Sequence, residues 1–235
     1  RRAAEADHVA HGAAGEEAQR SRKLNVTAAK PVDGAWLFAQ ECRFVAGTET
    51  LDRLPPPGLP EIAFAGRSNV GKSSLLNALT GRHHLARVSN TPGRTQQINF
   101  FDLGGRLMLV DLPGHGYAKV AKTKVKGWTR LVDQYLRGRP NLQRVLLLLD
   151  SKVGIKDADE TLMDRMDESG LSYQAVMTKA DNLKPAELAA MQAKLAATLR
   201  RRPACHPEIP ITSSAKGTGI AELRQALAAF AVADA

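Results

Sequence analysis

The segment that most constrains the fold of this chain lies at residues 66–73 and reads Gly-Arg-Ser-Asn-Val-Gly-Lys-Ser. It matches the pattern G-x-x-x-x-G-K-[ST] at every fixed position, with an apolar run before it at residues 62–65 and a helical pattern after it at residues 74–79. In this strand-loop-helix context the segment forms a P-loop, whose backbone N–H groups and helix N-terminus face a phosphate. The alternative is an ordinary glycine-containing loop with a chance Lys-Ser pair, which the flanking patterns disfavour.

Two side chains of the predicted P-loop carry its chemistry. Lys72 is expected to reach the β- and γ-phosphates of a nucleotide and to act in catalysis, and the Ser73 hydroxyl is expected to bind Mg²⁺. The residues expected to bind the nucleotide here are Gly66, Arg67, Ser68, Asn69, Val70, Gly71, Lys72, Ser73 and Ser74.

Strand-like and helix-like segments alternate along the chain. Strands are expected at residues 62–65, 97–103, 106–110, 145–150, 173–178 and 209–213, with a further short strand at 43–46. Helices are expected at residues 122–137, 158–168, 185–201 and 219–231. The turn at Gly104-Gly105 makes one hairpin, and the other connections are right-handed crossovers. The sequence therefore predicts an α/β fold of the P-loop NTPase class, a three-layer α/β/α arrangement with a mainly parallel six-stranded sheet and one antiparallel strand.

Length and composition indicate one folded domain. The chain has 235 residues and 43% hydrophobic content, enough to bury a core. Residues 1–34 show no sustained apolar period and no apolar core of a secretory signal, so we expect a disordered extension there and a folded domain at 35–235. No apolar run approaches the roughly 18 residues of a membrane span. Cys42 and Cys205 have no metal-like spacing, which indicates reduced thiols in a soluble, cytoplasmic protein.

The net charge of +9 is unevenly distributed. Residues 1–60 carry 8 basic and 8 acidic residues, so the rest of the chain holds the whole excess, 25 basic against 16 acidic. Within it, residues 112–148 contain eight basic residues against Asp133 alone, a charge of +7. The eight are Lys119, Lys122, Lys124, Lys126, Arg130, Arg137, Arg139 and Arg144. A polyanionic partner is one interpretation of this run, and a solvated helix face is the other.

An acidic residue follows one of the expected strands, in the segment Asp111-Leu112-Pro113-Gly114. Ligands of parallel α/β sheets bind at the carboxyl ends of the strands, so Asp111 is expected beside the P-loop as the Mg²⁺-side acid. Gly114 is expected to approach the γ-phosphate. Thr95, in a polar loop, is expected to add a second hydroxyl to Mg²⁺, and a plain turn threonine is the alternative.

Two tetrapeptides follow the last two expected strands, Thr178-Lys179-Ala180-Asp181 and Ser213-Ser214-Ala215-Lys216. Both are expected to build a base pocket at the same sheet edge, away from the phosphates. A carboxylate at Asp181 can accept guanine N1–H and N2–H₂, whereas adenine would leave it unpaired, so the pocket selects GTP over ATP. The stems of Lys179 and Lys216 can cover the base, and the Ala215 amide can donate to guanine O6.

With Asn90-Thr91-Pro92-Gly93-Arg94-Thr95-Gln96 and Gly116-Tyr117-Ala118, these segments resemble the TRAFAC-class GTPases, and more closely the EngB (YihA/YsxC) family of bacterial GTP-binding proteins. The resemblance covers roughly residues 38–230. It implies Mg²⁺-dependent binding of GTP and GDP, slow GTP hydrolysis, and contacts from Gly93, Arg94 and Thr95 to the nucleotide. It also implies a role in large ribosomal subunit assembly and in division septation. The expected partner is the large ribosomal subunit or its precursor, bound by a monomer, without DNA or a membrane.

Two residues raise separate questions within this resemblance. At the position of His115 the family usually carries a bulky aromatic residue. Many other GTPases have a water-positioning Gln at this position, and translation-factor GTPases have a His. His115 is therefore a candidate catalytic residue, and a side chain turned away from the nucleotide is the alternative. Asn69 stands where related GTPases bind K⁺ beside the phosphates, and an Asn that only stabilises the loop is the alternative.

Two rival functions share the P-loop. A P-loop kinase would not need the guanine pocket expected around Asp181. A nucleotide-dependent binding module with incidental hydrolysis would have the same motifs as a GTPase switch, and only measured turnover separates the two.

Overall fold

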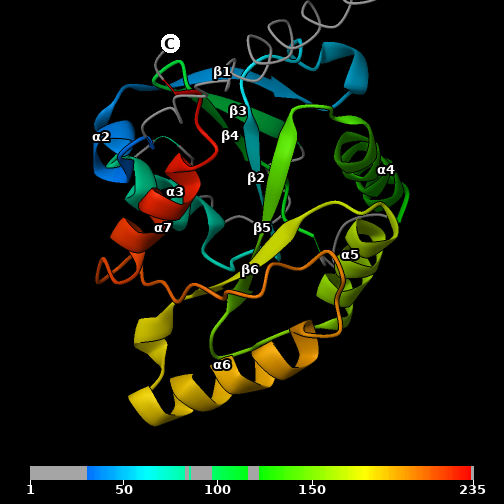
Figure 1. Ribbon diagram of the computed structural model, residues 1–235. Helices are drawn as coiled ribbons and strands as arrows, with labels where there is room; N and C mark the ends of the chain where they lie inside the picture. Colours follow the sequence, from blue (N-terminus) through cyan, green and yellow to red (C-terminus); the bar gives the residue numbers. More distant parts are fainter. Residues whose placement is uncertain (1–30, 83–84, 86–96, 116–121, 234–235) are drawn as a thin grey trace, which may run out of the picture. The chain divides into compact units, whose positions relative to one another are not determined.

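The computed structural model of the chain describes residues 31–82, 85, 97–115 and 122–233 (Figure 1). Its strands are β1 (Cys42–Thr48), β2 (Glu61–Gly66), β3 (Ile98–Leu103), β4 (Leu107–Asp111), β5 (Leu142–Asp150) and β6 (Tyr173–Thr178). Its α-helices are α2 (Gly34–Ala39), α3 (Lys72–Thr80), α4 (Lys122–Gly138), α5 (Asp157–Glu168), α6 (Pro185–Leu199) and α7 (Ile220–Ala228), with 3-10 turns η1 (Leu51–Arg53) and η2 (Ala180–Asn182). Among the described helices, none has the length and apolar composition that a bilayer crossing needs.

The described strands form one sheet in the order β1-β3-β4-β2-β5-β6. β2 lies between β4 and β5 and is parallel to both, and β6 is parallel to β5. β3 runs antiparallel to both of its neighbours, β1 and β4. The predicted six-stranded, mainly parallel sheet with one antiparallel strand is confirmed.

One expected strand is wrong. Residues 209–213 make isolated bridges rather than a strand. The segment still follows β6, because the Thr212 N–H donates to the Met177 carbonyl at 2.7 Å. Pro210 interrupts the ladder because proline has no N–H to donate. The sixth strand is β1 at the opposite edge, where the short strand expected at 43–46 extends over seven residues.

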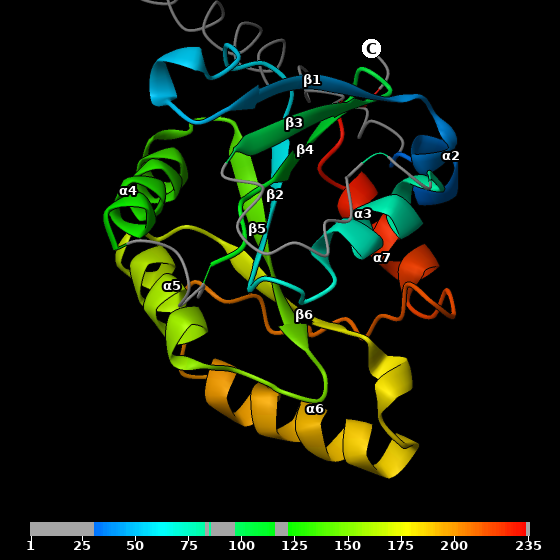
Figure 2. The same cartoon turned by 180° about the vertical axis from the view of Figure 1, so that it is seen from behind.

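The helices cover both faces of the sheet. Along the central strand β2, where every residue is buried, Ala63 and Ala65 pack into the core under α4, α5 and α6. Ile62 and Phe64 point the other way, into the core under α2, α3 and α7. Figures 1 and 2 show α2, α3 and α7 on one face and α4 and α5 on the other, with α6 next to the edge strand β6. This is the predicted three-layer arrangement, and it leaves the carboxyl ends of the parallel strands to loops that carry the site.

Helix α2 lies where the sequence pattern predicted no element. Asp33 caps it by accepting a hydrogen bond from the Trp36 N–H at 2.7 Å. Gly34 permits a close contact with α7, because a Cβ there would lie 2.5 Å from the Gln225 backbone nitrogen. A helix of six residues is too short for its apolar period to stand out in a sequence.

A buried ion pair anchors the start of β2 to the end of α4. Glu61 is 1% exposed, and its Oε1 lies 2.6 Å from Nη2 of Arg139. The Tyr135 hydroxyl donates to Glu61 Oε2 at 2.8 Å. Burial, followed by the charge of Glu61, raises the pKa of Tyr135 well above its usual value, so the hydroxyl stays a donor at neutral pH.

The Glu61→Gln variant is expected to lower the free energy of unfolding by about 3 kcal/mol, because the Arg139 guanidinium would stay buried without its counter-charge. Urea unfolding measures the change. Arg43→Gln is the control: the Arg43 side chain is 64% exposed in its pair with Asp102, so this variant is expected to lose less than about 1 kcal/mol. Equal losses in the two variants would contradict the role given to Glu61.

Candidate functional site

The phosphate loop connects β2 to α3 and has the backbone conformation that its sequence demands. Asn69 and Gly71 have φ values of 62° and 104°, in the left-handed region that Asn tolerates and Gly adopts freely. At Gly66, a Cβ would lie 2.8 Å from Cγ1 of Val70, so the loop closes on itself only without a side chain there. The turn then brings its N–H groups and the start of α3 to one point, as expected of an anion site.

The acidic segment at the end of β4, residues 111–114, lies directly against this loop. The Leu112 N–H donates to the Phe64 carbonyl at 3.0 Å, and the His115 N–H donates to the Gly66 carbonyl at 3.1 Å. Gly114 is pressed against the loop, because a Cβ there would lie 3.0 Å from the Ser68 Oγ. Residues 111–114 thus occupy the place beside the P-loop that the sequence predicted.

The Lys72 ammonium forms an ion pair with Asp111, whose side chain is 7% exposed. Ser73 follows Lys72 in the first turn of α3, so a hydroxyl, a carboxylate and the phosphate-binding N–H groups gather at one end of the sheet. Hard oxygen donors of this kind fit Mg²⁺, which takes one or two protein ligands and completes its shell with phosphate and water. The residues present therefore fit the expected metal.

The first base tetrapeptide contacts the P-loop directly, which the sequence did not predict. The Thr178 hydroxyl donates to the Val70 carbonyl at 2.6 Å, and the Lys179 ammonium donates to the Asn69 carbonyl at 2.7 Å. Lys179 also pairs with Asp150, at 2.9 Å between Nζ and Oδ2. These contacts fix the start of the base segment relative to the phosphate loop.

The second base tetrapeptide holds the carboxylate of the first. The Ser213 hydroxyl donates to Oδ1 of Asp181, and it accepts a hydrogen bond from the Lys216 N–H at 3.1 Å. The backbone joins them as well, through the Ala180 N–H and the Thr212 carbonyl at 3.1 Å. Asp181 is therefore oriented by Ser213, which the sequence had assigned to the pocket only by its position.

A cleft of about 620 Å³ joins the two sides of the site. Its walls come from the P-loop and α3, from both base tetrapeptides, and from the turn after α3. They are Gly71, Ser74, Asn77, Ala78, Gly81, Arg82, Thr178, Lys179, Asp181, Asn182, Ser214 and Ala215. This volume is typical of a small-molecule site. The contributors from Asn77 to Arg82, on α3 and in the turn after it, were missed, because no motif in the sequence distinguishes them from an ordinary helix surface.

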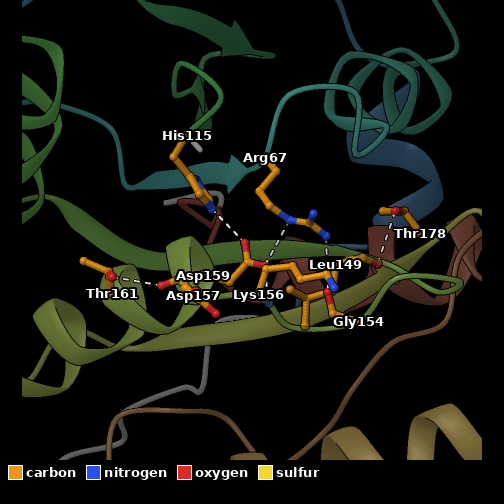
Figure 3. Close-up of polar contacts among 9 residues, drawn as sticks. All are labelled: Arg67, His115, Leu149, Gly154, Lys156, Asp157, Asp159, Thr161 and Thr178. Carbon is orange, nitrogen blue, oxygen red and sulfur yellow. Dashed lines mark hydrogen bonds and ion pairs between the residues drawn. The ribbon is translucent and has the colours of Figure 1, made fainter. Parts of the chain in front are cut away.

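Asp159 is a further residue that the sequence did not single out. Figure 3 shows the side chains of His115 and Arg67 both pointing at its carboxylate, in the first turn of α5. None of these three residues lines the cleft. The imidazole of His115, predicted as a candidate catalytic group, therefore points toward α5 in this structure.

Part of the predicted site lies outside the described residues. Gly93, Arg94 and Thr95, and the segment 116–118, stay predictions.

Comparisons with known proteins agree with this geometry. A family model described as "50S ribosome-binding GTPase" matches residues 61–179. A protein from Rhodospirillum rubrum named "Probable GTP-binding protein EngB" is 57% identical over 203 residues, covering 84% of this chain and 88% of its own. A protein of the same name from Gluconobacter oxydans is 51% identical over 206 residues, covering 88% and 91%.

Solved structures show the same fold at lower identity. A crystal structure of a probable GTP-binding protein engB has a TM-score of 0.56 and 22% identity, and covers 70% of this chain and 94% of its own. The crystal structure of Era in complex with MgGDPNP and a fragment of 16S ribosomal RNA has a TM-score of 0.60 and 21% identity, and covers 76% and 59%.

The phosphate loop, the acid at the end of β4 and the Asp181 carboxylate at the same end of the sheet are the arrangement of a P-loop GTPase, a class that binds GTP and GDP and hydrolyses GTP. The chain belongs to the EngB family of GTP-binding proteins.

The Asp181→Asn variant is expected to lose affinity for GDP by at least about 100-fold, because an amide cannot accept from both N1–H and N2–H₂ of guanine. It is expected to gain affinity for xanthosine diphosphate, whose C2 oxygen can accept from the new amide. Calorimetric titration measures both. Asp164→Asn removes a carboxylate outside the cleft and is the control. Unchanged GDP binding in Asp181→Asn would place the base elsewhere.

Proposed function

We propose that this GTPase is a switch in large ribosomal subunit assembly, with slow Mg²⁺-dependent hydrolysis, and that it is needed for normal division septation. The observation that carries the proposal is membership of a family whose model is described as "50S ribosome-binding GTPase". The partner is the large subunit or its precursor, met in the cytoplasm by a monomer without DNA or a membrane. Residues 35–235 are its G domain, and residues 1–34 an extension.

The residues of the chain supply binding and orientation. The N–H groups of the P-loop bind the phosphates, and Lys72 exchanges Asp111 for the β- and γ-phosphates. Asp181 selects guanine, and His115 orients the attacking water. Ser73, Thr95 and Asp111 would hold Mg²⁺, which would neutralise the charge that develops on the phosphates.

A K⁺ site at Asn69 stays a prediction. The left-handed φ of 62° at this position also suits the alternative, in which Asn is present because the loop needs a residue that tolerates that conformation.

Fewer of the eight basic residues between residues 112 and 148 are available to a partner than the sequence suggested. The Arg139 side chain is buried against Glu61, and Cζ of Arg144 lies 4.8 Å from the centroid of the Phe230 ring. Arg137 pairs with Asp133 and with Glu168. Arginines that are already paired or buried add little to an electrostatic surface. The basic residues of the first half of α4 are then the candidates for contact with rRNA phosphates: Lys122, Lys124, Lys126 and Arg130.

Reversing Lys122, Lys124 and Lys126 to Glu is expected to abolish GTP-dependent co-sedimentation with large-subunit precursors and to leave GTP affinity unchanged. Each phosphate contact releases condensed counterions when the protein binds. A single variant that lacks one contact should therefore bind more weakly, and its binding should depend less steeply on salt concentration. Co-sedimentation in GTP and GDP at several salt concentrations measures this.

The matched control reverses the exposed residues Lys194, Arg200 and Arg201, which carry the same total charge on and after α6. It is expected to retain particle binding. If both triple variants bind the particles as the unaltered protein does, the contact lies on another face. If both triple variants lose particle binding equally, binding depends on net charge and not on the position of the three lysines of α4.

A further inference from the structure

The buried carboxylate of Asp159 connects α5 to the P-loop and to the residue after Gly114 (Figure 3). Its Oδ1 lies 2.8 Å from Nε2 of His115, and its Oδ2 lies 3.0 Å from Nε of Arg67. The Asp159 side chain is fully buried, whereas those of His115 and Arg67 are 17% and 22% exposed. An ionised carboxylate only accepts hydrogen bonds, so Nε2 of His115 carries the hydrogen in this contact.

The two oxygens of Asp159 are held in different ways. Oδ2 accepts the Lys156 N–H at 3.0 Å and faces Arg67, whose Nη2 donates to the Gly154 carbonyl at 3.2 Å. Oδ1 faces His115. If the imidazole leaves, Asp159 keeps Arg67 as its counter-ion, so no buried charge is stranded. The contact with His115 is therefore the one that can break and reform.

The backbone of His115 is attached to the P-loop independently of its side chain. Its N–H donates to the Gly66 carbonyl at 3.1 Å, and its carbonyl accepts from the Ser68 N–H at 3.4 Å. These bonds keep the Cα of His115 beside the phosphate loop. A change of side-chain rotamer alone can then take the imidazole away from α5.

We propose that Asp159 is a positioning residue for GTP hydrolysis: it holds the His115 imidazole against α5, and hydrolysis speeds up when this contact is released. The inference rests on the role of His115 in the proposed function. Only molecules whose His115 imidazole is released from Asp159 can orient the attacking water. The observed kcat is therefore the kcat of the released state multiplied by the fraction of molecules in that state.

Asp159 also has a purely structural role, from which the proposal must be separated. It is the third residue of α5, and its acceptance of the Lys156 N–H is a capping interaction. Loss of the cap would lower stability, but it would not change turnover through His115.

The test is a double-mutant cycle of Asp159→Asn and His115→Ala, with kcat and KM for GTP measured at saturating Mg²⁺. The expected result is a slower kcat in His115→Ala, and a kcat in Asp159→Asn that rises about threefold to tenfold with an unchanged KM. In the His115→Ala background, Asp159→Asn should have no effect on kcat. Asp157→Asn removes an exposed acid from the same helical turn and is expected to change neither constant.

The outcomes separate the proposals. An unchanged His115→Ala rate overturns both the catalytic role of His115 and the positioning role of Asp159, without touching ribosome binding. A slower His115→Ala rate with an unchanged or reduced rate in Asp159→Asn overturns the positioning role alone. If Asp159→Asn changes kcat equally in the unaltered protein and in His115→Ala, Asp159 affects hydrolysis independently of His115, and the positioning role is overturned.

A measurement on the unaltered protein covers the case in which Asp159→Asn fails to fold. Long-range ¹H–¹⁵N spectra of the histidine rings, assigned with His115→Ala, report on Nε2 of His115. With GDP the nitrogen is expected to be protonated and hydrogen-bonded, and with GDP and aluminium fluoride this signature is expected to be lost. Identical His115 signals in the two states would overturn the proposal.

Discussion

Two hydrogen bonds to the backbone of the P-loop hold the guanine side and the phosphate side of this GTPase together. They come from the Thr178 hydroxyl to the Val70 carbonyl and from the Lys179 ammonium to the Asn69 carbonyl. Asp181 follows within three residues and is oriented by Ser213. The carboxylate predicted to read the base is therefore placed by the end of β6 and not by a free loop. Because both sides are fixed, the cleft offers one spacing between base and phosphates, which suits a single nucleotide.

The parts of this structure that the sequence predicted well depend on local patterns. The strand before Gly66 and the helix after Lys72 are set by hydrophobic periodicity and by a loop with fixed glycines. Asp111 and Asp181 could be placed without coordinates, because carboxyl ends of parallel strands meet at one edge of a sheet. The single antiparallel strand followed from the hairpin, and the parallel direction of the other strands followed from the crossovers.

The parts that were missed depend on partners far away in the sequence. Asp159 reads as an ordinary first-turn acid of a helix, and only the fold brings His115, 44 residues earlier, to its carboxylate. Glu61 reads as a polar strand end, but α4 brings Arg139 over it and buries both. The last expected strand was judged by its apolar residues, whereas the missing N–H of Pro210 decided its pairing. Tertiary contacts decide the outcome at Asp159 and Glu61, whereas Pro210 is a local feature that the apolar pattern concealed.

The central claim is that the P-loop and Asp181 bind the two ends of one guanine nucleotide. Calorimetric titration of the full chain with GDP and with ADP, each with Mg²⁺, tests it most directly. The account predicts one site for GDP and binding of ADP weaker by at least about 10³-fold, because adenine leaves the Asp181 carboxylate without its donor pair. It also predicts that Lys72→Ala weakens GDP binding. Equal affinities for GDP and ADP, or a Lys72→Ala variant that binds GDP as the unaltered protein does, would contradict the account.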